Sequence, residues 1–257
     1  MRSPARSRYG PAVDADGYFG EEIAATYDSD GTGEFDPAVI GATADFLAAR
    51  AGAGPALEFA IGTGRIALPL AARGVPVHGI ELSAAMTARL RAKDGGPAIP
   101  VALGDMTTTR LAERFSLVYL VFNTIMNLTT QDAQVDCFAN AAAHLQPGGC
   151  FVIEVMVPEL RKLPAGQTVV PWAVTGTHVA FDRYDTATQA MSSNYIDVEN
   201  GQGRYWSIPF RYAWPAELDL MARLAGLRLR ERWAGWQGEP FTAESTRHVS
   251  VWERPAA

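Results

Sequence analysis

The sequence ALEFAIGTGRIAL at residues 56–68, followed by VHGIELS at residues 77–83, decides the fold of this chain. The first run predicts a buried strand, a turn built on Gly62 and Gly64, and the start of a helix. The second run predicts another strand, which ends at the carboxylate of Glu81. A strand, a glycine turn, a helix and a second strand of this kind form a binding site for a cofactor that carries a nucleoside.

Strands and helices alternate from residue 56 to residue 156. The apolar runs predict strands at 56–60, 76–82, 100–103, 115–122 and 150–156, with helices at 65–73, 84–93 and 131–145. Strands that are apolar on both faces and separated by helices predict a parallel sheet covered on both sides. Pro147-Gly148-Gly149 predicts a sharp turn into the fifth strand.

The first 55 residues precede this alternation. Residues 1–17 show no periodicity, which predicts a loose tail, and residues 18–28 carry a helical pattern that fits a short lid helix. The glycine-broken stretch 30–33 fits a hinge. A longer helix is expected to begin at Asp36 or Pro37 and to end near Gly52.

The composition of the chain changes after Pro158. Runs rich in Thr, Val and aromatic residues predict an antiparallel insertion with strands at 168–174, 177–184, 189–198 and 204–213. A helix at 215–225 and a strand pair at 227–236 and 247–253 follow. We therefore divide the chain into a tail with a lid helix and a leading helix (1–55), a cofactor-binding core (56–157), a β insertion over the substrate pocket (158–214), and a closing helix and strand pair (215–257).

The overall composition is that of a protein with one α/β domain. It has 257 residues, of which 48% are hydrophobic and 19% charged. The net charge of -6 comes without a block of Lys and Arg, so we expect no nucleic-acid partner. No apolar run is long enough for a membrane span or a secretion signal, so we expect a cytoplasmic protein without a membrane partner. We expect a monomer or a homodimer.

Several chemistries are excluded by residues that are rare or poorly spaced. Lys93 and Lys162 are the lysines of this chain, so it has no Gly-Lys-Ser/Thr phosphate loop and poor candidates for a Schiff base. Cys137 and Cys150 are expected to be buried free thiols. No Cys/His group has metal-ligand spacing, and we expect no metal.

The glycine turn alone fits two cofactor classes. Gly62-x-Gly64-x-x-Ala67 satisfies a relaxed dinucleotide fingerprint, so it is compatible with a nicotinamide cofactor as well as with S-adenosylmethionine. Glu58 favours the second, because a carboxylate before the turn opposes a pyrophosphate but tolerates the positive end of a methionine zwitterion. Gly104-Asp105-Met106, after the third strand, adds an acceptor for an adenine amino group beside an apolar surface.

Four motifs in this order resemble those of the class I S-adenosylmethionine-dependent methyltransferases. They are Glu58-x-x-x-Gly62-x-Gly64, the acidic strand end at Glu81, Gly104-Asp105-Met106, and Leu145-x-Pro147-Gly148-Gly149. The resemblance covers about residues 18–156 and implies a Rossmann-like α/β fold, with a mostly parallel seven-stranded sheet whose last strand is antiparallel. It implies S-adenosyl-L-methionine as cofactor. The β insertion and residues 121–127 resemble most the small-molecule methyltransferases of bacterial secondary metabolism.

The resemblance also implies which residues bind the cofactor. We expect Glu81 to bind the ribose, Asp105 and Met106 to bracket the adenine, and Phe122 and Asn123 to lie beside the sulfonium. Tyr27 is expected to close over the methionine end, and Arg65 to pair with its carboxylate. The full set is Tyr27, Glu58, Ala60, Gly62, Gly64, Arg65, Glu81, Leu82, Asp105, Met106, Phe122 and Asn123.

Ala60 departs from the family pattern, which has a glycine at this position. Its methyl group lies near the methionine portion of the cofactor. Binding is compatible with alanine there if the local φ is negative.

The acceptor of the methyl group is less constrained by the sequence. The aromatic run Tyr205 to Trp214 predicts a pocket for a planar aromatic small molecule, such as an indole-bearing intermediate, methylated on N, O or C by in-line displacement. His178, Tyr184 and Tyr195 are the candidates for removing a proton. The alternatives are an NAD(P)-dependent oxidoreductase and a non-catalytic module that only binds the cofactor.

Overall fold

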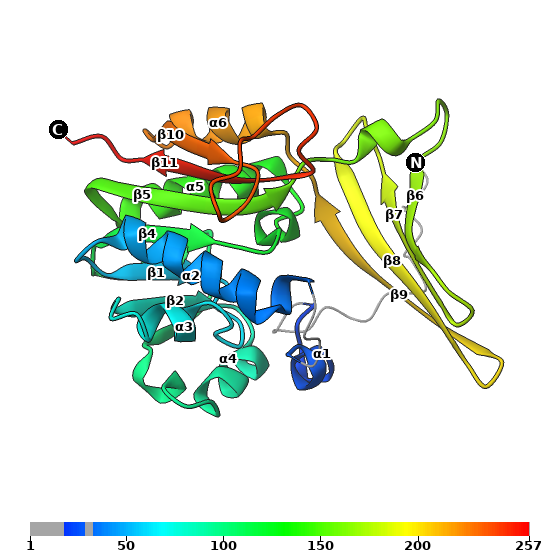
Figure 1. Ribbon diagram of the computed structural model, residues 1–257, viewed down its shortest axis with the longest axis horizontal. Helices are drawn as coiled ribbons and strands as arrows, with labels where there is room; N and C mark the ends of the chain where they lie inside the picture. The colour runs from blue at the N-terminus through cyan, green and yellow to red at the C-terminus, as the bar shows by residue number, and fades with distance from the viewer. Residues whose placement is uncertain (1–17, 29–32, 257) are drawn as a thin grey trace, which may run out of the picture.

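The computed structural model describes residues 18–28 and 33–256 of the chain. The tail predicted over residues 1–17 lies outside these residues, as does most of the hinge predicted at 30–33. The described residues form two β-sheets, and helices cover the larger one (Figure 1).

A seven-stranded sheet forms the centre of the fold, in the order β10, β11, β5, β4, β1, β2, β3. Strands β1 to β5 pair in parallel, and β11 runs antiparallel to both of its neighbours. This confirms the predicted Rossmann-like α/β fold with an antiparallel last strand. The strands are β1 (Ala56–Phe59), β2 (Val77–Glu81), β3 (Val101–Leu103), β4 (Phe115–Leu120), β5 (Leu145–Met156), β10 (Arg228–Trp233) and β11 (Arg247–Glu253).

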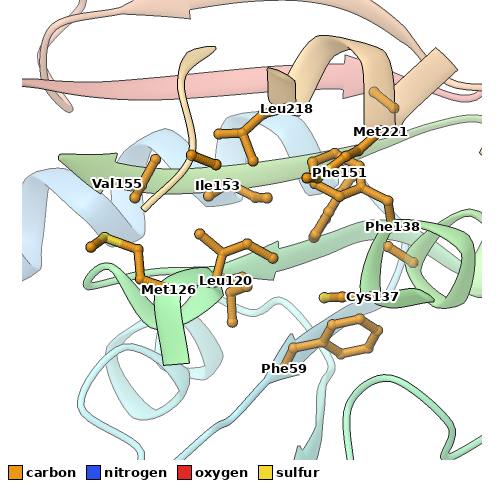
Figure 2. Close-up of a cluster of buried hydrophobic side chains, with 14 of the residues drawn as sticks. Phe59, Leu120, Met126, Cys137, Phe138, Phe151, Ile153, Val155, Leu218 and Met221 are labelled. Carbon is orange, nitrogen blue, oxygen red and sulfur yellow. The ribbon is translucent and has the colours of Figure 1, made fainter. Parts of the chain in front are cut away.

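Helices pack on both faces of this sheet because its central strands bury side chains on both sides. Every residue of β1 and β4 is buried. Leu47 and Leu70 belong to the core on one face, and Phe138 and Leu218 to the core on the other, where they pack with aliphatic side chains of β4 and β5 (Figure 2). The helices are α1 (Glu21–Thr26), α2 (Pro37–Ala51), α3 (Ala67–Ala71), α4 (Ala84–Arg91), α5 (Gln131–His144) and α6 (Pro215–Leu224).

The fifth strand differs from its prediction, because it begins at Leu145 and not at residue 150. The predicted turn at Pro147-Gly148-Gly149 lies inside it as a bulge, where Gly148 has φ +80° and the register with β4 shifts. A Cβ on Gly149 would lie 3.0 Å from the carbonyl oxygens of Phe115 and Ser116. The glycine pair therefore lets β5 pass close to β4.

The segment after β5 forms a separate four-stranded antiparallel sheet, as predicted for the insertion. Its strands pair in sequence order: β6 (Val169–Val174), β7 (His178–Tyr184), β8 (Ala190–Glu199) and β9 (Gln202–Arg211). Because the insertion follows the carboxyl end of β5, it stands beside the edge of the core sheet at which β1, β2 and β4 also end (Figure 1).

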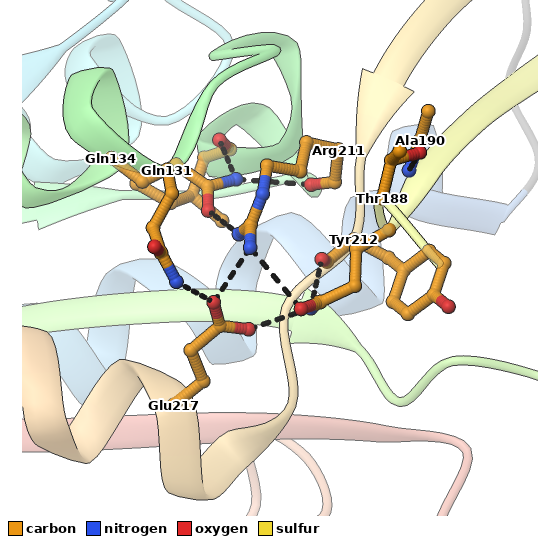
Figure 3. Close-up of polar contacts among 9 residues, drawn as sticks. Gln131, Gln134, Thr188, Ala190, Arg211, Tyr212 and Glu217 are labelled. Atoms are coloured by element: carbon orange, nitrogen blue, oxygen red, sulfur yellow. Dashed lines mark hydrogen bonds and ion pairs between the residues drawn. The ribbon is translucent and has the colours of Figure 1, made fainter. Parts of the chain in front are cut away.

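A buried arginine joins the base of this second sheet to the core. Arg211, 6% exposed, donates from Nη1 to Gln134 on α5 at 2.6 Å and from Nη2 to Glu217 on α6 at 2.7 Å. Gln189 and Gln131 also donate to the Glu217 carboxylate (Figure 3). A buried charge needs such partners, so this network fixes where the insertion leaves the core.

Cys137 and Cys150 are buried free thiols, as predicted. Within the described part of the chain, no helix has both the length and the apolar character needed to cross a bilayer.

Candidate functional site

A cavity lies at the carboxyl ends of β1 and β2, next to the loop after β3, and a smaller recess adjoins it at the glycine turn. The cavity is lined by Tyr18, Phe19, Tyr27, Ala60, Gly62, Ile80, Glu81, Leu82, Met86, Gly104, Asp105, Met106, Thr124, Asn127, Leu128, Ile208 and Pro209. The recess is lined by Tyr27, Glu58, Ala60, Ile61, Gly62, Thr63, Arg65, Ile66, Val121, Phe122 and Thr124. Of the twelve residues predicted to bind the cofactor, all except Gly64 and Asn123 line one or both.

The glycine turn between β1 and α3 needs both of its glycines. Gly62 and Gly64 have φ values of +57° and +77°, which L side chains rarely adopt. A Cβ on Gly64 would lie 2.3 Å from Cδ1 of Leu90, so the turn packs directly against α4. Gly64 does not line the cavity or the recess, but it allows the turn beside them to pack against α4.

Ala60 has a φ of +51°, which excludes the negative φ under which alanine would be unstrained. In this left-handed conformation its Cβ crowds the following carbonyl oxygen, at a cost of about 1–2 kcal/mol. Ala60 lines both the cavity and the recess. The chain thus places a strained alanine where the family pattern has a glycine.

Glu81 ends β2 at the cavity wall, and its carboxylate is held by two backbone donors. Oε2 accepts from the N–H of Gly62 at 2.7 Å, and Oε1 accepts from the N–H of Ser83 at 2.8 Å. The side chain is 6% exposed. These two bonds fix the orientation of the carboxylate relative to the glycine turn. Without them the acidic side chain would have no fixed orientation.

Asp105 and Met106 follow β3 on the neighbouring wall. Oδ1 of Asp105 accepts from the backbone and the hydroxyl of Thr107, each at 2.7 Å. Asn140 on α5 donates to the carbonyl of Met106 at 2.6 Å, which anchors this loop to the core. The loop offers an oriented carboxylate beside an apolar side chain, and Leu82 also lines the cavity.

The recess brings together a buried acidic side chain, Glu58, and a half-buried basic one, Arg65. Glu58 is 3% exposed and accepts from the Tyr119 hydroxyl at 2.8 Å, and burial raises its pKa to about 8. Arg65 donates from Nη1 to the carbonyl of Glu34 at 2.5 Å, while its buried Nε has no hydrogen-bond partner among the described residues. A zwitterion would meet a carboxyl group and an unused guanidinium donor here.

The segment after β4 forms a turn in which Phe122 and Asn123 both have positive φ, at +59° and +60°. Glu154 on β5 holds this turn, because Oε2 accepts from the N–H of Phe122 at 2.7 Å. Asn123 points away from the cavity, and its Oδ1 accepts from the N–H of Met156 at 2.7 Å. Burial and the neighbouring Glu34 carboxylate raise the pKa of Glu154 to about 7.

Sequence reasoning missed Glu154, although one signal was available. It is the single charged residue in the otherwise apolar run Cys150 to Met156. It also missed Thr124, Asn127 and Leu128, which line the cavity from the short 3-10 turn after Asn123.

Tyr27 lines both the cavity and the recess from the end of α1. Its ring belongs to a chain of edge-to-face contacts, with centroid distances of 6.2 Å to Phe19, 5.4 Å to Phe35 and, from Phe35, 5.8 Å to Phe122. Burial raises the pKa of Tyr27 to about 12, so its hydroxyl stays protonated at neutral pH. The chain of rings connects α1 to the turn after β4.

The three residues predicted as proton acceptors lie on the insertion and do not line the cavity. His178 pairs through Nδ1 with Asp197 at 2.5 Å, near the tip of the sheet. Tyr195 stacks on Trp206, with a centroid distance of 5.1 Å and an angle of 9°. Tyr184 is buried in the core at the base of the insertion, and burial raises its pKa well above its usual range. Ile208 and Pro209 of β9 are the insertion residues that form the cavity wall.

No group of His, Cys, Asp and Glu side chains within residues 18–28 and 33–256 is arranged to hold a metal ion.

Comparison with known proteins gives consistent results. The family described as "Methyltransferase domain" matches residues 56–149. The structure of the CcbJ methyltransferase from Streptomyces caelestis is 40% identical, covers 93% of this chain and 98% of that chain, and superposes with a TM-score of 0.81. Because this coverage exceeds the matched family segment, the similarity includes the insertion.

Two further relatives are more distant. The "Cypemycin N-terminal methyltransferase" from Streptomyces sp is 26% identical over 206 residues, which are 77% of this chain and 82% of the relative. The structure of CalS10 with bound SAM, an amino pentose methyltransferase from Micromonospora echinaspora involved in calicheamicin biosynthesis, is 25% identical, covers 91% of this chain and 96% of that chain, and has a TM-score of 0.64.

Proposed function

Because this chain belongs to the S-adenosylmethionine-dependent methyltransferases that act on small molecules, we propose that it methylates an amine nitrogen of its acceptor. Family membership sets aside the nicotinamide oxidoreductase and the non-catalytic module that the glycine turn alone left open. Of the relatives above, one is named for an N-terminal methylation and another for an amino pentose.

The choice of nitrogen is supported by the residues of the cavity wall nearest the insertion. The cavity wall beside the insertion consists of neutral residues, namely Thr124, Asn127, Leu128, Ile208 and Pro209, and no histidine, lysine or cysteine is among the described residues that line it. An unprotonated amine attacks through its own lone pair and loses its proton afterwards, whereas a hydroxyl acceptor needs a base during the attack. A neutral wall therefore supports nitrogen as the nucleophile.

We assign the sugar and base of the cofactor to the cavity. Glu81, oriented by Gly62 and Ser83, accepts from the ribose hydroxyls, and Asp105 accepts from the adenine amino group while Met106 packs on the ring. Leu82 covers the same ring from the other side.

The methionine end of the cofactor is assigned to the recess. Arg65 donates to its carboxylate through the guanidinium nitrogen that lacks a partner, and Glu58 lies where its ammonium binds. When bound, the cofactor supplies a methyl group that the positive sulfur already activates. Phe122 and Asn123 hold the wall beside this group, and Tyr27 closes the recess and excludes water.

The shape of the acceptor is proposed from the face of the insertion that continues the cavity wall. Trp206 lies on the same face as Ile208, two residues along β9, and stacks on Tyr195. This pair of stacked rings suits an acceptor that contains a ring, including the planar indole-like acceptor expected from the sequence. Tyr195 belongs to this surface, and we assign it to acceptor binding and not to proton removal.

The test combines the protein with isotopically labelled S-adenosylmethionine and a panel of matched amines and alcohols, and identifies the labelled products by mass spectrometry. N-methyl products formed from the amines would support the proposal. Exclusive O- or C-methylation would contradict the choice of nitrogen. S-adenosylhomocysteine should raise the melting temperature, whereas NAD and NADP should not.

A further inference from the structure

The inner face of the insertion carries a row of residues that leads away from the cavity. Asp182 on β7 is paired in register with Ser193 on β8, and Ser193 with Ile208 on β9. Residues directly opposite each other in an antiparallel sheet point to the same side. Because Ile208 lines the cavity, Asp182 lies on the cavity side of the sheet, two strand spacings or about 10 Å beyond Ile208.

The carboxylate of Asp182 is oriented but has no opposite charge. Oδ1 accepts from the Ser193 hydroxyl at 2.7 Å and from the indole N–H of Trp172 at 3.2 Å. No Lys, Arg or His of the described chain pairs with it, and no described residue donates to Oδ2. A half-buried carboxylate without a cation is costly in free energy, unless a ligand supplies the charge. Burial accordingly raises its pKa.

Aromatic rings stand on the same face beside this carboxylate. Tyr195 lies two residues beyond Ser193 on β8, on the same face of the sheet, and stacks on Trp206. The ring of Trp172 meets Tyr195 edge to face at 5.7 Å and is 53% exposed. An oriented carboxylate beside the exposed ring of Trp172 is suited to an organic ammonium group, through charge and through cation-π attraction.

We propose that Asp182, with Trp172 and the Tyr195–Trp206 stack, forms the subsite that holds a positively charged group of the acceptor, whose ring lies on the stack. The proposal rests on the proposed function, because it describes the acceptor of that same site. The nitrogen that receives the methyl group has to be unprotonated and to lie in the cavity, so the charged group at Asp182 is a different part of the molecule. The acceptor class is a ring-containing small molecule with a nucleophilic amine and a separate cationic group.

Calorimetric titration of the complex with S-adenosylhomocysteine tests this directly. The probes are para-xylylenediamine, which is dicationic at neutral pH, and the neutral diol of the same shape, para-xylylene glycol. The wild-type protein should bind the diamine about tenfold to a hundredfold more tightly than the diol, as expected for a charge-assisted contact. Asp182→Asn should remove most of that difference and leave binding of the diol unchanged.

Two further variants separate charge from packing. Trp206→Ala should weaken both probes by a similar factor, since the ring surface does not depend on the charge of the ligand. Asp185→Asn makes the same charge change on an exposed turn three residues away, and it should leave both affinities unchanged. Melting curves of all variants report whether the fold is kept.

The proposal is overturned if the diamine does not bind, if it binds no more tightly than the diol, or if Asp182→Asn weakens both probes equally. Because the titration involves no methyl transfer, these outcomes are independent of which atom the enzyme methylates. Conversely, exclusive O-methylation in the product assay would contradict the proposed function and leave the binding result intact.

Discussion

The side-chain carboxylate of Glu154 accepts a hydrogen bond from the backbone N–H of Phe122 at 2.7 Å, and so connects β5 to the turn beside the recess. Both residues of that turn, Phe122 and Asn123, have positive φ, which costs free energy in the absence of outside support. Glu154 therefore acts as a positioning residue for the wall of the site.

Replacing Glu154 should affect cofactor binding according to whether an acceptor is kept. Glu154→Ala removes a partly buried, charge-assisted hydrogen bond and should weaken binding of S-adenosylhomocysteine about tenfold or more, consistent with about 1.5–3 kcal/mol. Glu154→Gln keeps a carbonyl acceptor at the same place and should stay within a few-fold of wild type. Calorimetry measures the affinities of both variants. A wild-type affinity in Glu154→Ala would show that the turn keeps its conformation without this hydrogen bond.

Glu81→Ala should weaken S-adenosylhomocysteine by about 1–3 kcal/mol, because a buried and oriented acceptor is lost. Glu113, exposed on the loop before β4, offers a matched control, and Glu113→Ala should leave the affinity unchanged. Unchanged binding in Glu81→Ala would remove this residue from the proposed ribose site.

Glu58 predicts a specific dependence of stability on pH. Its pKa is about 8 in the folded protein against 4.5 ordinarily, so the folded state binds a proton that the unfolded state releases in this window. The stabilisation is fully present below pH 4.5 and is lost as pH rises through 8. The free energy of unfolding of wild type, relative to Glu58→Gln, should therefore fall across this window by a few kcal/mol, at about 1.4 kcal/mol per pKa unit. Denaturant titrations at several pH values measure it, and parallel profiles for the two proteins would contradict it.

Ala60→Gly should stabilise the protein or leave its melting temperature unchanged, because glycine relieves the strain of a φ of +51°. An alanine-to-glycine substitution in a helix or strand usually destabilises a protein. Ala88→Gly on the exposed face of α4 should cost about 0.5–1 kcal/mol, as glycine does inside a helix. A loss at Ala60 equal to that at Ala88 would show that the alanine is not strained.

The strands of the core could be predicted from the sequence because they are apolar on both faces and are separated by segments with a helical pattern. A parallel sheet also predicts that Glu81 and Asp105 lie at the same edge of the sheet, because the carboxyl ends of parallel strands lie together. The role of Glu154 could not be predicted, because a hydrogen bond to the backbone of residue 122 depends on the relative register of β4 and β5. The placement of His178 and Tyr195 outside the cavity likewise depends on register and on the length of the hairpins, which the aromatic pattern does not specify.

The Arg211 network sets a condition for recombination between relatives. Arg211 and Gln189 belong to the insertion, whereas Gln134 and Glu217 belong to helices of the core. A chimera that transplants residues 158–214 from another enzyme would break this joint unless the donor segment brings a matching guanidinium. Exchange of acceptor preference by grafting the second sheet therefore requires either a donor segment that supplies this guanidinium or transfer of the two helix positions along with the sheet.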